Sequence, residues 1–398
     1  NLRRLNLDVD TIVGIHGNPT PMSQFREFVR TEQRQGTFQD SAQRATGPRK
    51  SVSMQSRTRP VTVTVIALTC ALAVPFTVGA QVERVADPSW STPRTADGQP
   101  DLQGLWGNKT ITPTERPDSA EGRAFLTDEE MAAANQRRVQ SLQAQDAAPA
   151  QRTSAGGQLG AYGSYWLDSG DTVLSTGQTS LIVDPPDGRA PIKSWALEAK
   201  AYGLAHEGED YRYLSTLDRC LSRGVPGSML PAGYNNTHRI AQTPDHIVLQ
   251  HEMIHDLRII PLSDHAHIDA RIGLWMGDAR AHWEDDVLVV ETKNFHNRGW
   301  LATSGAGRRL KGIPTSKAMH VVERYERVSE STIMWTVTVE DPNVYTRPWT
   351  ISIPLTAEPD YVIYEYACHE GNYAIPNILA GARMEEATAA QATAEGSR

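Results

Sequence analysis

Short runs of β-branched and aromatic residues, separated by polar turns, fill the second half of the chain. They predict strands, because such side chains suit a pleated surface with one buried face. The turns are short, so neighbouring strands form hairpins, and a mostly β antiparallel barrel or sandwich is predicted, with a calycin-like barrel as one form of it. The predicted strands are residues 179–184, 238–242, 246–252, 256–261, 273–275, 281–283, 287–292, 320–328, 331–340, 349–353 and 362–367.

Upstream of most of these strands, the pattern indicates one or two helices. Thr127 followed by Glu130 is a capping box, in which each residue satisfies a backbone N–H of the other. It predicts a helix that continues to about residue 144. A second, shorter helix is predicted over 197–206. There is no alternation of strands and helices and no phosphate-binding glycine loop, so a nucleotide-binding α/β fold is disfavoured.

The remaining segments have few periodic apolar positions. Residues 81–117 are rich in Pro, Thr and Asp, and we interpret them as an extended arm anchored at 101–106. Residues 145–160 are mostly Ala, Gln, Gly and Ser, which is typical of a linker. The predicted organisation is an arm, helix and linker over 81–160, a β-rich domain over 161–386 and a disordered tail over 387–398.

Residues 54–80 carry the three parts of a secretory signal peptide in order. Two arginines give a positive start, residues 61–74 form an uncharged apolar run, and small residues lead up to Ala80. Cleavage there would leave Gln81 as the first residue. We therefore expect an exported protein, periplasmic or extracellular, without a membrane span after cleavage.

Two other interpretations of this segment are weaker. A retained transmembrane anchor needs about 20 apolar residues, and this run is shorter and has no basic cluster after it. A lipoprotein cysteine at Cys70 is disfavoured because the apolar run continues beyond it.

Residues 1–53 precede the signal peptide, although such signals act at the N-terminus of a protein. Residues 7–29 resemble the C-terminal strand and helix of a metallo-β-lactamase-fold hydrolase, in which a histidine such as His16 can bind metal. His16 would have no partner ligands here. We interpret Met54 as the translation start and 1–53 as the tail of an upstream gene, without function. A disordered cytoplasmic leader is the alternative.

Charge and cysteine content narrow the partners and the compartment. The net charge is −8 and there is no basic block, which disfavours nucleic acid and anionic membrane surfaces as partners. Loss of Cys70 with the signal leaves Cys220 and Cys368, and an even count in an oxidising compartment predicts a disulfide. Two buried free thiols are the alternative. A disulfide disfavours Cys368 as a nucleophile, although His369 and Glu370 follow it.

Histidines are concentrated between residues 238 and 282, which leaves two kinds of metal site open. One is the H-E-x-x-H string from His251 to His255, which binds zinc in peptidases when both histidines share a helix face. The flanking residues favour strands, so this site is disfavoured. Ordinary surface histidines are the alternative to any metal. The second kind would gather Zn, Cu or Fe with His251, His255, His265 and His267, assisted by His238 or His369.

Carboxylates, histidines and tryptophans give candidates for catalysis and ligand binding. For the charged residues, a buried salt-bridge network is favoured over acid–base machinery, because structural ion pairs mimic active sites. Core packing is the usual role of tryptophan. The catalytic candidates are Glu252, His255, His369 and Glu370. The ligand-binding candidates are Arg258, Trp275, Trp283, Glu291, Asn294 and Glu323.

Several strings in the mature chain together resemble one family. They are residues 179–188, 219–226, 275–278, 283–284, 288–292, 294–295, 321–324, 339–342, 347–349 and 364–373. Over about residues 90–386 the chain resembles a large family of secreted, uncharacterised bacterial proteins. The resemblance implies export and a cysteine at both Cys220 and Cys368, but no activity. The turn 263–267 and the string 283–286 depart from the family pattern, so the chemistry of that turn differs here if it is functional.

Three functions are open from the sequence. The first is an exported β-rich protein that binds a small ligand, hydrophobic or carbohydrate-like, in a barrel or cleft. The second is a secreted hydrolase or lyase with a His/Glu site, with or without a metal. The third is a structural envelope protein.

Overall fold

A computed structural model of the chain describes residues 11–12, 20–21, 85–87, 89–147 and 167–396. Contacts divide the chain into two units, Asn1–Ala73 and Val74–Arg398. In the first unit, β1 (Thr11–Ile12) and β2 (Thr20–Pro21) pair antiparallel. The predicted signal peptide at 54–80, and all but these two strands of the predicted upstream tail, lie outside the described residues.

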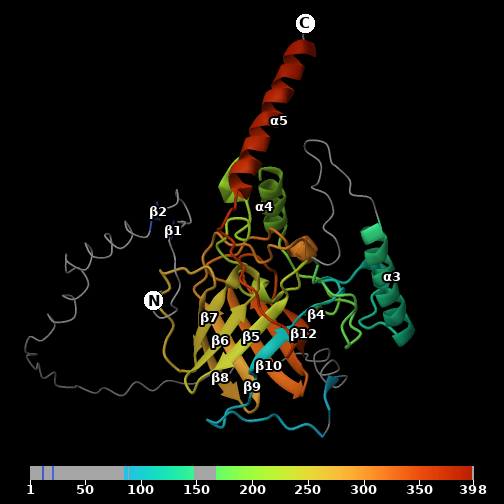
Figure 1. Cartoon of the computed structure of the whole chain (residues 1–398), viewed down its shortest axis with the longest axis vertical. Helices are drawn as coiled ribbons and strands as arrows, with labels where there is room; N and C mark the ends of the chain where they lie inside the picture. The colour runs from blue at the N-terminus through green and yellow to red at the C-terminus, as the bar shows by residue number, and fades with distance from the viewer. Residues whose placement is uncertain (1–10, 13–19, 22–84, 88, 148–166, 397–398) are drawn as a thin grey trace, which may run out of the picture. The chain divides into compact units, whose positions relative to one another are not determined.

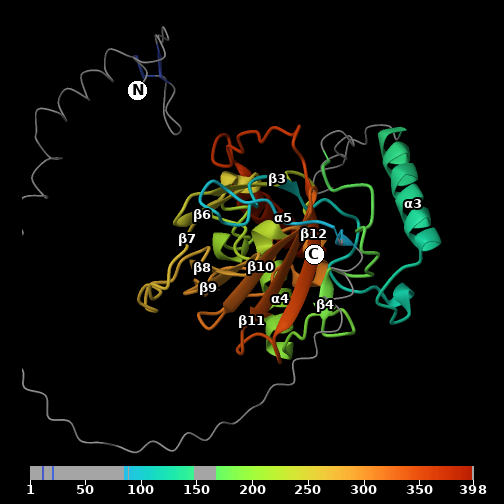
Figure 2. The same cartoon turned by 90° about the horizontal axis from the view of Figure 1, so that it is seen from below.

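The second unit contains a ten-stranded antiparallel sheet that curls into a nearly closed barrel (Figures 1 and 2). This confirms the predicted mostly β antiparallel architecture. Neighbouring strands follow the order β7-β6-β5-β3-β12-β11-β10-β9-β8, and β4 pairs with β12. The strands are β3 (Gly104–Gly107), β4 (Ile182–Asp184), β5 (Thr237–Gln242), β6 (His246–His251), β7 (Leu257–Pro261), β8 (Asp278–Glu284), β9 (Val287–Lys293), β10 (His320–Ser329), β11 (Thr332–Glu340) and β12 (Trp349–Ala357).

The seam of the barrel lies between β7 and β8. A parallel bridge just beyond the end of β7 joins Leu262 to Ala281 of β8, instead of a ladder of the kind that links the other neighbours in the sheet. The two edge strands therefore meet with few backbone hydrogen bonds. Side-chain contacts across the interior have a correspondingly larger share in holding this part of the barrel together.

Two predicted strands are wrong. At 273–275, Leu274 forms only an isolated bridge with Phe295, and Gly277 turns the chain with a φ of +69°. At 362–367, Val362 and Tyr364 are exposed, so the segment has no buried face to pair against. A side-chain contact from Glu252 to the Tyr364 backbone helps to hold this segment in place.

The predicted anchor of the extended arm is a barrel strand. Strand β3 lies between β5 and β12, and Trp106 is buried with its indole N–H donating to the Leu102 carbonyl. A four-residue strand with glycine at both ends has almost no local pattern. Its place in the sheet depends on pairing with β5 and β12, which are distant in sequence, and local periodicity does not indicate such pairing.

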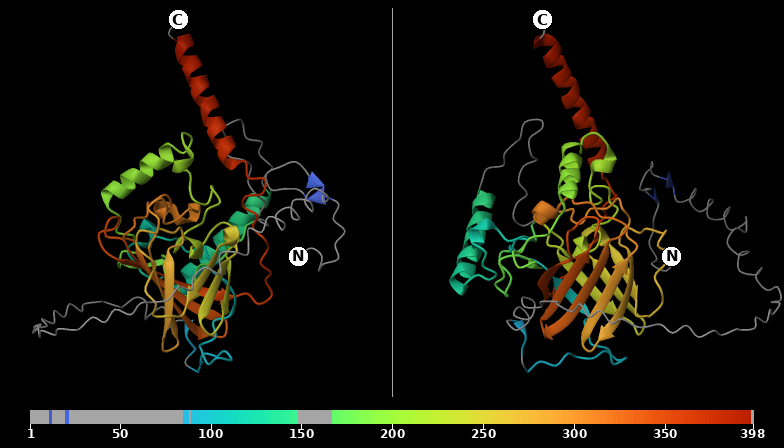
Figure 3. Two further views of the ribbon diagram at one scale, coloured as in Figure 1. Left: turned by 90° about the vertical axis from the view of Figure 1, so that its left-hand side faces the viewer. Right: turned by 180° about the vertical axis from the view of Figure 1, so that it is seen from behind.

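The described helices are α3 (Asp128–Ala147), α4 (Ser194–Ala205) and α5 (Ala374–Gly396). The capping box of α3 is confirmed: Glu130 N–H donates to Thr127 Oγ1 and Thr127 N–H to Glu130 Oε2. The predicted disordered tail is wrong through Gly396, because good helix formers such as Ala and Glu continue α5. In Figure 3, α5 extends away from the barrel. Within the described ranges, none of the helices is sufficiently long and apolar to cross a membrane.

Large side chains fill the barrel interior. Alternate residues of the long strands point inward, as in β10, where buried and half-buried residues alternate along most of the strand. Trp106, Trp335 and Tyr325 are among the largest fully buried side chains. The inner face is therefore a packed core, and open pockets are found near the loops and on the outer face.

Cys220 and Cys368 form a disulfide, as predicted. It ties the loop before β5 to the segment before α5. Replacement of both residues (Cys220→Ser with Cys368→Ser) is expected to lower the free energy of unfolding by about 2–4 kcal/mol, because the crosslink restricts the unfolded chain. The linked residues are 148 positions apart, which makes this restriction large. Urea unfolding under oxidising conditions measures the effect, and equal midpoints for the two proteins would contradict it.

Candidate functional site

Two predicted ligand-binding residues bind each other inside the barrel. Arg258 of β7 donates from Nη2 to Glu323 Oε2 of β10 at 2.6 Å and from Nη1 to Oε1 at 3.1 Å. The Tyr325 hydroxyl also donates to Glu323, and Arg258 reaches the Thr292 hydroxyl. Burial alone would lower the pKa of Arg258, but the Glu323 charge and hydrogen bonds raise it. Arg258 and Glu323 therefore form a buried network whose main hydrogen bonds are already made.

A pair of buried histidines lies in the same interior. His238 of β5 and His251 of β6 are cross-strand partners, and their Nδ1 atoms are 3.0 Å apart. One Nδ1 must donate and the other accept, so at least one ring is neutral. Burial, together with the charge of Arg223, lowers the pKa of His238 to about 3. Burial and the nearby positive groups lower the pKa of His251 as well.

The H-E-x-x-H string does not form a zinc-peptidase helix. His251 ends a strand, and Ile254 and His255 have left-handed φ values of +62° and +46°. His251 is fully buried, whereas His255 is exposed. The two histidines therefore do not share a helix face, which is the requirement of that site.

The structure does not bring the four predicted metal-binding histidines together. His251 is inside the barrel, whereas His265 is exposed on the loop after β7 and His267 is half-buried there. Among the residues described, no three His, Cys, Asp or Glu side chains are grouped so that they could hold a metal ion.

The predicted catalytic residues are separate in their contacts. The Glu252 carboxylate is buried and accepts from the Tyr361 hydroxyl at 2.8 Å. His255 Nδ1 lies 2.5 Å from the Tyr366 carbonyl oxygen. His369 and Glu370 are both exposed. In the described part of the chain, no side-chain hydrogen bond or ion pair joins any two of these four candidates.

Other candidates gather on the outer face of β8, β9 and β10. A pocket of about 490 Å³ lies there, which we name the side pocket. This volume is in the range of small-molecule sites. The pocket combines an apolar surface with a polar rim. Its lining residues are Ser263, Asp264, His265, Ala266, His267, Arg280, Ala281, His282, Val289, Glu291 and Val322.

Strand alternation explains why this set shares one face. In the β8–β9 ladder Arg280 pairs with Glu291 and His282 with Val289, so all four side chains leave the same surface of the sheet. The loop that follows β7 adds His267. Three sequence candidates, including Glu291, thus line one pocket.

His267 is held between two carboxylates. Its Nδ1 is 2.9 Å from Asp278 Oδ2, and its Nε2 is 3.3 Å from Glu291 Oε2. The other Glu291 oxygen is 2.9 Å from His320 Nε2 and 2.6 Å from Lys293 Nζ. A carboxylate on Nδ1 fixes the tautomer and the orientation of an imidazole.

Both carboxylates remain ionised at neutral pH. Burial alone would raise the pKa of Glu291, but hydrogen bonds from Lys293 and His267 and the nearby positive charges lower it to about 2. The same balance holds for Asp278. Burial alone would raise its pKa, but hydrogen bonds from the Ile268 backbone, Arg280 and His267 lower it. The wall of the side pocket is therefore a set of neutralised ion pairs.

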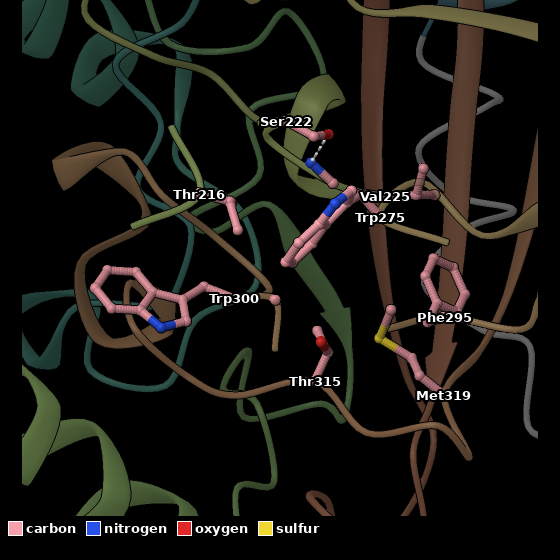
Figure 4. A pocket seen from close by; sticks show the side chains of 10 residues that line it. Thr216, Ser222, Val225, Trp275, Phe295, Trp300, Thr315 and Met319 are labelled. Atoms are coloured by element: carbon pink, nitrogen blue, oxygen red, sulfur yellow. Dashed lines mark hydrogen bonds between the residues drawn. The ribbon is translucent and has the colours of Figure 1, made fainter. Parts of the chain in front are cut away.

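The remaining predicted ligand-binding residues have separate places. Trp283 points inward and packs against the core. Asn294 has a φ of +58° and donates from Nδ2 to the Ile268 carbonyl at 2.8 Å, so it fixes the loop over the side pocket. Trp275 lines a narrow slot of about 10 Å³, room for about one water. Figure 4 shows the slot, with the bond from the Gly224 N–H to Ser222 Oγ dashed.

Sequence reasoning missed Asp278, Arg280 and His320. The alternating string from 278 to 284 carried the signal, because Asp278, Arg280 and His282 occupy every second position of one strand. The predicted strand covered only 281–283, so the first two of these residues were left outside it.

Comparison of the chain with family models, curated proteins and solved structures gives no match. Function is therefore argued from the geometry of the described residues.

Proposed function

We propose that the protein binds a small neutral, hydroxyl-bearing molecule of carbohydrate type in the side pocket. The observation that carries the proposal is the oriented His267 imidazole at the wall of a pocket of about 490 Å³. Val289 and Val322 offer an apolar surface for the carbon face of such a ligand. The histidines and Glu291 at the rim offer hydrogen bonds for its hydroxyl groups.

The charge balance favours a neutral ligand over an ion. Arg280 already pairs with Asp278 at 2.7 Å, and Glu291 with Lys293 at 2.6 Å. A charged ligand would have to compete with these partners. A hydroxyl group can instead donate to a carboxylate or accept from an imidazole without breaking an ion pair.

The proposal includes export. The disulfide between Cys220 and Cys368 supports it, because such bonds persist in oxidising compartments and are rare in the cytosol. Export is also what residues 54–80 predict.

A large side chain placed in the side pocket should weaken sugar binding. Val289→Trp places an indole in the side pocket, and we expect it to weaken binding of a recognised sugar at least about tenfold, since it takes the ligand's volume. Saturation-transfer-difference NMR with glucose, galactose, mannose and xylose gives the dissociation constants. Val287→Trp is the matched control, because Val287 lies on the same face of β9 and does not line the pocket.

Two outcomes would reject the assignment. Saturable binding by none of the four sugars would leave a structural role as the better function. An equal loss in the Val287→Trp control would place the ligand elsewhere. Variants that lose secondary structure by circular dichroism are identified before the titrations.

Acid–base catalysis at the same pocket is a second candidate. One observation favours it: Asp278 on Nδ1 leaves His267 Nε2 as the group that could exchange a proton near Glu291. The protein would then be a secreted hydrolase or lyase. Turnover of a bound glycoside that is lost in His267→Gln, with binding retained, separates this candidate from simple binding.

A further inference from the structure

A second cluster of unusual chemistry surrounds Trp275, outside the side pocket. The indole stacks on the His296 ring, with centroids 4.7 Å apart and planes at 12°. The guanidinium carbons of Arg219 and Arg298 lie 5.8 and 5.9 Å from the centre of the same indole. We name these four residues the Trp275 patch.

Neither arginine of the patch has a carboxylate partner within the described part of the chain. Arg219 Nε donates to the Ser215 carbonyl at 3.4 Å, and Arg298 Nη2 contacts His296 Nε2 at 2.8 Å. Some exposed arginines, such as Arg271 and Arg324, form ion pairs with carboxylates, whereas others, such as Arg239, have none among the described residues. What distinguishes Arg219 and Arg298 is that two arginines without a carboxylate partner lie on the same indole.

The positive groups of the patch act against one another. Burial lowers the pKa of Arg219 and the charge of Arg298 adds to the effect, while the nearby Tyr211 and Asp218 oppose it. Burial likewise lowers the pKa of His296, with further contributions from Arg298 and Lys317. Stacking on an indole accounts for the attraction of one guanidinium to Trp275. It does not account for two guanidinium groups placed on the same ring, neither of them bonded to a carboxylate of the described chain.

The patch adjoins the slot shown in Figure 4, which hydroxyl-bearing residues line in part. Trp275 belongs to both features, and the hydroxyl-bearing residues Thr216 and Thr315 line the slot beside it. Thr315 Oγ1 is fixed by donation to the His296 carbonyl at 3.1 Å. The slot has room for a water or a single oxygen and excludes a larger group.

We propose that the Trp275 patch binds the oxyanion group of a small acid, with the guanidinium groups of Arg219 and Arg298 as its donors. An oxyanion presents several acceptor oxygens, so it can bridge two guanidinium groups and supply the bonded acceptors that neither group has from a carboxylate of the described chain. Carboxylates, sulfates and phosphates share this chemistry. The site is independent of the sugar pocket proposed above.

Fluorine NMR of protein labelled with 5-fluorotryptophan tests the proposal at the residue itself. The Trp275 resonance is assigned by its absence in Trp275→Phe. Titrations with acetate, sulfate and phosphate at constant ionic strength should shift that resonance saturably for at least one of the three. The anion with the lowest dissociation constant identifies the source of the oxyanion.

Single-charge variants decide whether the two arginines are the donors. Arg219→Gln and Arg298→Gln should each weaken binding tenfold or more, as loss of a charge-assisted hydrogen bond implies. Arg239→Gln removes an exposed positive charge on β5 and should change the affinity less than twofold. Absence of a saturable shift with all three anions overturns the proposal, and so does an equal loss in Arg239→Gln.

Discussion

Arg258→Met is expected to lower the free energy of unfolding by about 3–5 kcal/mol. The change leaves the Glu323 carboxylate fully buried without its cationic partner, while Tyr325 still donates to it at 2.9 Å. An uncompensated charge in a packed interior is among the largest single-site penalties in proteins. Urea unfolding at pH 7, followed by far-ultraviolet circular dichroism, measures the loss.

Two comparisons separate this effect from loss of packing. Arg324→Met removes an arginine from the outer face of β10, where its ion pair with Glu284 is half-exposed, and should change stability by less than about 1 kcal/mol. The double change Arg258→Met with Glu323→Met removes both charges and should recover most of the loss. If Arg258→Met destabilises no more than Arg324→Met, the buried pair has no such role.

The position of the pair explains why a barrel would keep a charge in its core. Arg258 lies on β7, one edge of the seam, and Glu323 lies on β10, beyond β8 and β9 on the other side. The pair therefore spans the interior across the seam that the isolated bridge closes. The further bond to Thr292 on β9 ties β7 to a second strand on that side. We therefore expect the network to form in only one alignment of the edge strands β7 and β8.

Local pattern predicted the long strands well and the closure of the barrel poorly. Strands β9 to β12 alternate or run apolar over seven or more residues, which a single sequence shows clearly. Strand β3 was missed because its four residues gain their place from pairing with β5 and β12, far away in sequence. The residues at 362–367 look like a strand but pair with no other strand in the part of the chain that the structure describes.

The candidate site was predicted in part for the same reason. His267 and Glu291 were named from residue type alone, and the structure places them 3.3 Å apart. Their partner Asp278 was not named, because its role depends on the register of β8 against β9. The H-E-x-x-H string was disfavoured as a zinc site because its flanks favour strands, and the structure agrees: His251 ends β6, and Ile254 has a left-handed backbone conformation.

Acidification from pH 6.5 to 4.5 is expected to lower the free energy of unfolding by about 4–5 kcal/mol through the buried histidine pair. The pKa of His238 is about 3 in the folded protein, and that of His251 is also well below its usual value. Burial of the two rings is the largest cause of both shifts. The unfolded chain titrates near pH 6.5, so it binds protons that the folded chain rejects. Stability is complete above pH 6.5 and is lost as the pH falls toward the folded pKa values.

The chosen window separates the histidines from the carboxylates whose pKa values are lowered in the folded protein. The pKa values of Glu291 and Asp278 are lowered in the folded protein, so their contribution is present above the ordinary carboxylate pKa and is lost mainly below pH 4.5. The Nδ1 to Nδ1 hydrogen bond adds a second reason for the loss. A proton on the accepting Nδ1 removes that bond and places two N–H groups against each other.

Variants of the pair test this assignment directly. His251→Gln removes one of the two titrating rings, and its amide can still bond to His238, so the loss between pH 6.5 and 4.5 should fall to about half. His246→Gln, on the same strand but partly exposed beside Asp245, should leave the loss unchanged. Urea unfolding at four pH values in this window gives each slope. A wild-type stability that stays constant over the window, or a slope in His251→Gln equal to that of the wild type, would show that other groups control the acid response.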